Sequence, residues 1–186
     1  GVFPHALKAN TNIQFCLAQK KIDGSPTNGI ERRQTTLTAF VADNAMKYYS
    51  MGGLDAWDPT VYMNIWICNL QDYGGYAQFP GGGINQTYGV VVRTSLFAPL
   101  DSTLYMGHGA VTGHELGHCL NLRHVWADDD VACTGTDYCL DTPNQAGHSR
   151  LMDLSSIPAS GLMTDACSPL DPGIMYQNFM DYTADI

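Results

Sequence analysis

The sequence predicts an α/β (α+β) fold in which strands and a helix are followed by an irregular C-terminal part. Residues 62–68 (YMNIWIC) and 88–95 (YGVVVRTS) are rich in β-branched and aromatic residues, which favour strands, and the first is apolar enough for a central strand. Residues 109–120 have the length and spacing of a helix. From Val125 onward regular periodicity is lost, and aspartate, glycine, proline and cysteine dominate.

The other predicted elements are short. Residues 12–18 (NIQFCLA) alternate apolar and other side chains, which predicts a strand. Residues 33–41 fit either a strand or a helix, and residues 43–50 fit a short helix capped by Asp43. Residues 74–83 (GGYAQFPGGG) are interpreted as a glycine-rich connection, because they lack the helix context of a phosphate-binding loop.

Composition and charge exclude several classes of protein. Apolar residues make up 45% of the chain and charged residues 15%, so a sizeable core can be buried. The net charge of −9 argues against nucleic acid or an anionic membrane as a partner, because both bind basic surfaces. No apolar run approaches the roughly 20 residues that cross a bilayer. The chain opens at Gly1 as a processed protein would, and we expect a secreted monomer.

The cysteines indicate disulfides and no cysteine metal site. Three of the six cysteines lie in the irregular stretch 133–167, where bridges commonly fix loop-rich chain. No CxxC pair is present, so a cysteine-ligated zinc is not expected. Cys119 lies within the predicted helix, and we expect it to be a buried free thiol.

The stretch HELGHCLNLRH, residues 114–124, predicts a metal centre. Residues four apart on a helix project from the same face, so His114 and His118 can hold one Zn²⁺ at about 2.1 Å. Glu115 points somewhat aside. From there its carboxylate can reach an attacking water without displacing a ligand, which is the position of a general base.

His124 is the candidate third ligand. In a continuing helix it would lie roughly 15 Å beyond His114, so the helix must end after Leu120 and the chain must turn back. Asn121 is suited to that turn, because asparagine tolerates the left-handed conformation that ends helices. Three protein ligands leave a fourth position for water, as in catalytic zinc sites. The other histidines lack partner spacing and are expected at the surface or in hydrogen bonds: His5, His108 and His148.

At these residues the sequence resembles a metzincin, whose signature HExxHxxGxxH is followed downstream by a methionine turn. It resembles most closely the pappalysin (cytophagalysin-like) family. The segments that match, in order and along nearly the whole chain, are NIQFCLAQ, PTNGIERRQT, NIWICNL, GGYAQFPGG, GVVVRTS, GHELGHCLNLRHVW, DTPNQ and YQNFMDYTAD. Asn121 stands where the family has glycine, and the chain ends at Ile186, where relatives continue.

The resemblance implies the zincin/metzincin fold. Residues 1–124 would form an N-terminal subdomain with a twisted, mixed, mostly parallel sheet, a backing helix and the active-site helix. Residues 125–186 would form a small irregular C-terminal subdomain that contains the Met-turn. Substrate would lie extended in the cleft between them and pair with an edge strand that includes part of 84–93.

The resemblance also implies roles for individual residues. It implies that Glu115 is the general base and that the zinc ligands are His114, His118 and His124. Met180, in NFMDY, would be the methionine of the Met-turn beneath the metal. Tyr182 would lie near the zinc and support the developing oxyanion; the competing interpretation is an ordinary packed tyrosine.

Two further features rest on the resemblance. The family's layout implies a disulfide that joins Cys167 to either Cys133 or Cys139. Family members can also bind Ca²⁺ after the third histidine, and aspartates there offer hard oxygen ligands, with Asp141 the first choice. Solvated loop acids are the competing interpretation for the whole set: Asp128, Asp129, Asp130, Asp137 and Asp141.

The predicted function is that of a zinc-dependent endopeptidase that hydrolyses extended peptides or proteins. The family suggests Arg or Lys after the scissile bond, for which Asp181 and Asp185 are the nearest acids. A zinc-containing module that binds peptides without cutting them is an alternative, against which the presence of Glu115 argues. A zinc amidase for small molecules is a second alternative, against which the ordered family match argues.

Overall fold

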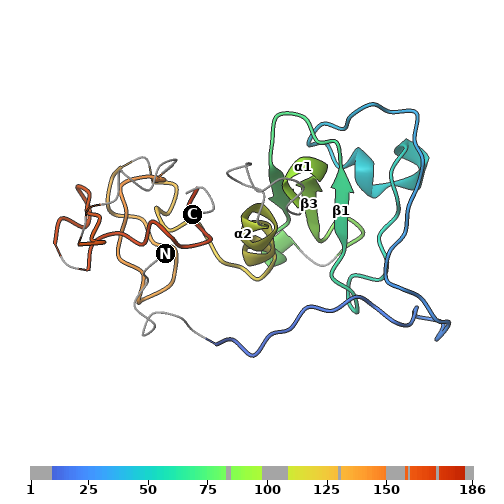
Figure 1. The fold of residues 1–186 in the computed structure, drawn as a ribbon, viewed down its shortest axis with the longest axis horizontal. Helices are drawn as coiled ribbons and strands as arrows, with labels where there is room; N and C mark the ends of the chain where they lie inside the picture. Colours follow the sequence, from blue (N-terminus) through green and yellow to red (C-terminus); the bar gives the residue numbers. More distant parts are fainter. Residues whose placement is uncertain are drawn as a thin grey trace.

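The computed structural model describes residues 10–82, 85–97, 109–129, 131–149, 158, 160–170 and 172–182. Its helices and strands run from Ala45 to Cys119, and the described residues after His124 contain none. Figure 1 shows helix α2 (Ala110–Cys119) between the sheet on one side and the irregular C-terminal chain on the other. The division of the chain at 124/125 into two subdomains stays a prediction, and this arrangement is consistent with it.

A three-stranded mixed sheet forms the centre of the N-terminal part. β3 (Val90–Arg93) lies in the middle, with β1 (Ile65–Cys68) parallel on one side and β2 (Gly75–Ala77) antiparallel on the other. Short helical segments follow two of the strands: η4 (Pro80–Gly82) after β2 and α1 (Thr94–Phe97) after β3.

The core lies on both faces of β3, because successive side chains of a strand point to opposite faces. Val90 and Val92 pack with Cys119 of α2, and all three are almost completely buried. Val91 faces the other way, into a cluster that contains Met46 and Trp66. Cys119 is a buried free thiol, as predicted. Helix α2 is therefore fixed against the sheet along one side.

Two strand predictions need correction. The strand expected over 88–95 ends at Arg93, because Thr94 begins α1. The strand expected over 62–68 is the shorter β1, and it is an edge strand with one exposed face. Ile65 and Ile67 are 39% and 45% exposed, so a fully apolar run did not mean burial on both faces.

The edge strand beside α2 is β2, and the prediction that part of 84–93 forms a free edge is wrong. β3 hydrogen-bonds to a strand on each side, so its backbone has no free edge to offer. β2 lies within the predicted glycine-rich connection. The strand was not predicted there, because glycine is uncommon in strands. Gly75 is needed there, since a Cβ would lie 2.8 Å from the carbonyl oxygen of Val91 and 2.9 Å from Cγ of Glu115.

The region before β1 is less regular than predicted. Residues 12–18 form no strand: the side chains of Ile13, Phe15 and Leu17 are more than half exposed, and no described strand lies beside them. Figure 1 shows this segment as an extended run along the outside of the molecule. Within 33–41, neither a helix nor a strand forms, although Phe40 makes a parallel bridge to Leu70.

The helix predicted over 43–50 is replaced by two 3₁₀ turns, η2 (Ala45–Lys47) and η3 (Tyr49–Met51). The Asp43 carboxylate does accept a hydrogen bond from the Ala45 N–H, at 2.9 Å. Met46 of η2 packs in the core cluster on the face of the sheet away from α2. No helix among the described residues is long and apolar enough to span a membrane.

The C-terminal part is fixed by a disulfide and by contacts between the segment after His124 and the chain near residue 180. Cys133 and Cys167 are bridged, which selects one of the two predicted pairings, while Cys139 is free. Val125 and Trp126 form a small apolar cluster with Met180. The Val125 N–H donates to the Met180 carbonyl at 3.3 Å, so the segment just after His124 is held against the chain near residue 180.

Candidate metal centre

Helix α2 ends in a turn that returns the chain toward its own side chains. Asn121 has a φ of 72°, in the left-handed region, as predicted. The Leu122 N–H donates to the Gly117 carbonyl at 2.9 Å, and the Asn121 N–H donates to the His118 carbonyl at 3.0 Å. This pair of bonds is the Schellman motif, which satisfies the last carbonyls of a helix and reverses the chain.

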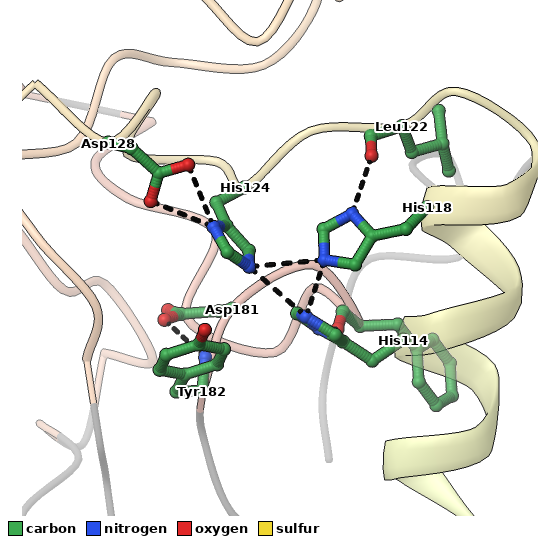
Figure 2. Close-up of polar contacts among 8 residues, drawn as sticks. His114, His118, Leu122, His124, Asp128, Asp181 and Tyr182 are labelled. Atoms are coloured by element: carbon green, nitrogen blue, oxygen red, sulfur yellow. Dashed lines mark hydrogen bonds and ion pairs between the residues drawn. The ribbon is translucent and has the colours of Figure 1, made fainter. Parts of the chain in front are cut away.

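The reversal brings three imidazoles together, as Figure 2 shows. The Nε2 atoms of His114 and His118 are 3.0 Å apart, and each is 3.2 Å from Nε2 of His124. Three ligand nitrogens around a tetrahedral Zn²⁺ at about 2.0–2.1 Å would be separated by about 3.3 Å. Within the described part of the chain, this is the only group of three or more metal-binding side chains that converges.

Each of these histidines has a hydrogen-bond acceptor at its other ring nitrogen. Nδ1 of His114 lies 2.6 Å from the Phe179 carbonyl oxygen, and Nδ1 of His118 lies 2.9 Å from that of Leu122. Nδ1 of His124 lies 2.8 and 2.9 Å from the two carboxylate oxygens of Asp128. Because these acceptors take the Nδ1 protons, the three Nε2 lone pairs face one another, and the donor set fits a zinc ion.

Burial favours the neutral, metal-binding form of the helix histidines. It lowers the pKa of His114 to about 4, against the opposing effect of the Phe179 carbonyl. It also lowers the pKa of His118, again opposed by a carbonyl, that of Leu122. Both imidazoles are therefore in the neutral form at neutral pH, with their one proton on Nδ1, so metal binding at Nε2 displaces no proton from either.

Glu115 lies beside the histidines in a buried position. Its side chain is 7% exposed, and burial raises the pKa of its carboxyl to about 8 in the absence of a metal. A divalent cation nearby would favour the charged form and oppose that effect. The side chain packs against Gly75, so β2 and α2 approach each other closely at this carboxylate.

Aromatic rings border the histidine cluster. Trp126 stacks on His124, with ring centroids 4.2 Å apart and planes within 7°. The Tyr182 ring lies 5.4 Å from His114 and 5.1 Å from His124. Tyr182 is 38% exposed, so it lies at the edge of the cluster with access to solvent.

Met180 lies against helix α2. It is 4% exposed, and a Cβ at Gly117 would be 2.4 Å from its sulfur atom. The neighbouring Phe179 supplies the carbonyl that orients His114, and its ring lies 3.2 Å from where a Cβ of Gly113 would be. The turn at 179–180 therefore supports both the helix and one of its histidines.

The comparison with protein families identifies this architecture. The sequence model of peptidase family M43, described as pregnancy-associated plasma protein-A, matches residues 42–185. The chain belongs to the M43, or pappalysin, family. Its fold is the zincin/metzincin fold, since mirolysin structures superpose on it with TM-scores of 0.87–0.88 at 41% sequence identity. These matches cover 98% of this chain and 68% of mirolysin, in one case the mature Tannerella forsythia protein in complex with a cleaved peptide.

Curated relatives are more distant. Extracellular metalloproteases of Arthroderma benhamiae and Trichophyton verrucosum are each 31% identical over 116 residues, which is 60% of this chain and 39% of theirs. An uncharacterised protein of Acanthamoeba polyphaga mimivirus is 25% identical over 155 residues, covering 75% of this chain and 16% of its own length. This pappalysin chain thus spans well under half of the curated relatives that it matches.

Asp181, predicted to lie near the pocket wall, is instead a buried structural group in this pappalysin. It is 4% exposed, and its Oδ2 accepts hydrogen bonds from Gln145 Nε2 at 3.0 Å and from Ser149 Oγ at 2.6 Å. Its Oδ1 accepts from the Ser149 N–H at 2.8 Å and from the Tyr182 N–H at 2.7 Å. That carboxylate is not available to a cationic substrate. Asp185 lies outside the described residues.

The predicted calcium ligands that the structure describes do not form a converging group of carboxylates. Asp128 is bound to His124, and Asp141 is exposed. Asp129 Oδ2 accepts from the N–H groups of residues 134 and 135, while its Oδ1 is buried and makes no hydrogen bond in the structure. Asp137 is buried, and Asp130 lies outside the described residues.

Three contributors to the site were missed by sequence reasoning. Asp128 is hydrogen-bonded to His124, and its spacing of four residues from a predicted metal ligand was the available signal. Trp126, two residues after His124, stacks on the imidazole of His124, but no sequence rule predicts which aromatic residue will do so. Gly75 permits the close approach of β2 to Glu115, and a glycine at the start of a short β-rich run was its only signal.

Proposed function

We propose that this pappalysin chain is a zinc-dependent endopeptidase that acts on extended polypeptides. The observation that carries the proposal is the convergence of three oriented histidine Nε2 atoms beside a buried glutamate. Three protein nitrogens leave a coordination position open, which distinguishes a catalytic from a structural zinc site. The zinc ligands would be His114, His118 and His124.

The zinc ion, when bound, supplies Lewis acidity, which polarises the scissile carbonyl and makes a water a better nucleophile at neutral pH. Glu115 acts as the general base. Its carboxylate takes a proton from the attacking water and passes that proton to the nitrogen of the leaving amine. The buried surroundings of this carboxylate exclude bulk water, which would otherwise compete for the proton.

Tyr182 supports the oxyanion that develops on the scissile carbonyl. Its ring lies beside His114 and His124, and it is exposed enough for a substrate to reach it. A phenol hydroxyl can donate a hydrogen bond to the developing negative charge. Met180 acts below the ligands as the methionine of the Met-turn. It binds no metal and forms an apolar support against Gly117.

Substrate pairs with the edge strand β2. This strand packs on α2 next to Glu115 and hydrogen-bonds to β3 on one side. An extended peptide added along the other side would gain backbone hydrogen bonds and would place its scissile bond near the metal centre. Phe79 follows β2 closely, and its ring centroid lies 4.9 Å from that of His118. It therefore extends the side of the site that β2 forms.

The family resemblance implies a preference for Arg or Lys after the scissile bond, and the charge of the chain supports it. The chain carries a net charge of −9, which attracts cationic peptides. Because the Asp181 carboxylate already accepts hydrogen bonds from Gln145, Ser149 and Tyr182, the preference would depend on other acidic residues. A cleavage profile across a proteome-derived peptide mixture tests this preference. We expect Arg or Lys to dominate at the position after the cut, and we expect the preference to weaken as salt is added.

A calcium ion in the loop after His124 is a second, separate proposal about this chain. The buried, unpaired Asp129 Oδ1 is the kind of oxygen that a hard cation satisfies, with Asp137 and Asp141 in the same loop. Added Ca²⁺ should raise the melting temperature of the wild type, and Asp129→Asn should abolish that rise. An equal rise in both proteins would contradict this site.

We also propose that the protein is secreted and monomeric. The fungal relatives are described as extracellular metalloproteases, and the Cys133–Cys167 disulfide suits an oxidising compartment. Fractionation of cells from medium and sedimentation at micromolar concentration test the two statements separately.

A substrate-length series on the zinc-loaded chain tests the endopeptidase proposal against its alternatives. An endopeptidase should cut denatured casein and should cleave octapeptides much faster than dipeptides or amino-acid amides. Binding of octapeptides without any cleavage would favour a peptide-binding module. Fast hydrolysis of small amides together with slow cleavage of long peptides would favour an amidase.

A further inference from the structure

His148 is a fourth imidazole close to the metal centre that the proposed mechanism does not use. Its ring lies 5.5 Å from that of Tyr182, with an angle of 28° between the planes, so the two rings stack. It also meets the edge of Trp126 at 5.6 Å. Sequence spacing had offered it no partner.

His148 is not a further ligand of the metal centre. Within the described part of the chain, the converging group consists of His114, His118 and His124. The contacts of His148 are with the rings that border this group, and its own side chain is exposed. Its role must therefore be exerted through Tyr182 or Trp126, or directly on a substrate.

Hydrogen bonds to the buried Asp181 carboxylate fix the chain next to both His148 and Tyr182. Asp181, which precedes Tyr182, accepts two hydrogen bonds from Ser149, which follows His148: one from the backbone N–H at 2.8 Å and one from Oγ at 2.6 Å. Gln145, which is fully buried, donates to the same carboxylate at 3.0 Å. The stacked rings are thus direct neighbours of two residues whose relative position is fixed.

The other rings around Tyr182 do not fix its orientation in the same way. Those of His114, His124 and Trp126 meet it at 47°, 74° and 68°. Of these four rings, that of His148 is closest to parallel with the Tyr182 ring. A stacked ring opposes tilting of its neighbour, because tilting would separate the two faces. An exposed tyrosine that must aim its hydroxyl at one point gains from such a contact, because displacements of about 1 Å reduce turnover strongly.

We propose that His148 is a positioning residue for Tyr182, which stacks on the phenol ring and holds its hydroxyl where the oxyanion of the substrate develops. The proposal rests on the role proposed above for Tyr182. It requires the flat ring of His148 and not its charge, so an apolar ring of similar shape should replace it.

The experiment compares kcat and KM of five zinc-loaded proteins on one octapeptide: wild type, His148→Ala, His148→Phe, Tyr182→Phe, and the double variant His148→Ala/Tyr182→Phe. We expect His148→Ala to lower kcat about tenfold, with KM within about twofold and zinc content unchanged. His148→Phe should restore most of the loss. In the Tyr182→Phe background, which lacks the hydroxyl, His148→Ala should have no further effect on kcat.

A sixth protein, Leu170→Ala, is the control. Leu170 is an exposed apolar residue of the same part of the chain, and this variant should match the wild type.

The outcomes separate this proposal from the one on which it rests. If Tyr182→Phe turns over as fast as the wild type, the role of Tyr182 is wrong and the positioning role of His148 is wrong with it. If Tyr182→Phe is slow but His148→Ala is not, the positioning role alone is contradicted. It is also contradicted if the two substitutions multiply in the double variant, if the loss in His148→Ala is in KM, or if His148→Phe is as slow as His148→Ala.

Discussion

A Cβ atom on Gly117 would lie 2.4 Å from the sulfur of Met180. Gly117 sits between Glu115 and His118 in helix α2, and Met180 lies in the turn whose Phe179 carbonyl accepts the Nδ1 hydrogen bond of His114. The helix and the turn therefore meet without space for one methyl group. We expect the positions of His114 and His118 on this helix to depend on that contact.

Gly117→Ala should destabilise the protein. In an open helix this change would stabilise by about 1 kcal/mol, because glycine is a poor helix former. Here the methyl group meets a buried thioether, and overpacking of this kind costs about 1–3 kcal/mol. Urea unfolding measures the difference. Gly81→Ala is the control, since a Cβ there meets nothing within 4 Å, and equal stability of the two variants would contradict the packing described above.

Substitution of Asn121 tests how His124 reaches the metal centre. Asn121→Gly should leave zinc affinity and activity within a few fold, because glycine accepts a φ of 72° without strain. Asn121→Val should impair both, since a β-branched side chain resists the left-handed conformation. Zinc titration and peptidase rates provide the measurement. A valine variant with full zinc binding would mean that the turn does not bring His124 into place.

Asp128→Ala should weaken zinc binding about 10- to 100-fold, the usual effect of losing a carboxylate that orients a histidine ligand. The Asp128 carboxylate is the hydrogen-bond partner of His124 Nδ1, so its removal leaves that ring without an acceptor there. Competition with a zinc chelator gives the affinity. Asp58→Ala removes an exposed carboxylate that bonds to Thr60, and it should bind zinc like the wild type. Equal affinities in the two variants would contradict the orienting role.

Lys47 should make stability depend on pH between about 8 and 9. Its side chain is 1% exposed, its Nζ donates to the Thr87 carbonyl at 2.7 Å, and burial lowers its pKa from 10.5 to about 8. The unfolded chain then binds more protons than the folded chain above pH 8, so the free energy of unfolding rises with pH. Above pH 9 the buried thiols of Cys68 and Cys119 act in the opposite direction, because burial raises their pKa values from 9.0 to about 11.

The comparison with Lys47→Met isolates this effect. The methionine keeps the apolar part of the side chain and carries no titrating group. Urea unfolding of both proteins from about pH 7.5 to 9 should show that the wild type gains stability relative to the variant as pH rises. Parallel curves would mean that Lys47 has an ordinary pKa in the folded chain.

The convergence of the three histidines was predictable because much of its geometry is local. The spacing of His114 and His118 and the suitability of Asn121 for a helix end are properties of eleven consecutive residues, 114–124. The structure adds contacts from residues that are distant in the sequence. Phe179 orients His114 from 65 residues away, and Met180 packs on Gly117 from the same turn.

The sheet was less predictable, because strand pairing depends on distant chain. Val90, Val91 and Val92 were predicted in a strand, but nothing local indicates that β3 lies in the middle with β2 at the edge. The alternation of Ile13, Phe15 and Leu17 suits a strand equally well, yet these residues have no described strand beside them. Periodicity indicates which face a residue takes and does not indicate which strand becomes its neighbour.

The most direct test of the account is turnover by metal-replete Glu115→Ala. The variant keeps His114, His118 and His124, so it should bind one zinc per chain as the wild type does. It lacks the proposed general base, which would move the proton from water to the leaving amine, so kcat on an octapeptide should fall by at least about 100-fold. Zinc content is measured on the same samples, and chelation by phenanthroline should abolish wild-type activity until zinc is restored. A zinc-loaded Glu115→Ala protein that cleaves the peptide at the wild-type rate would contradict the proposed function.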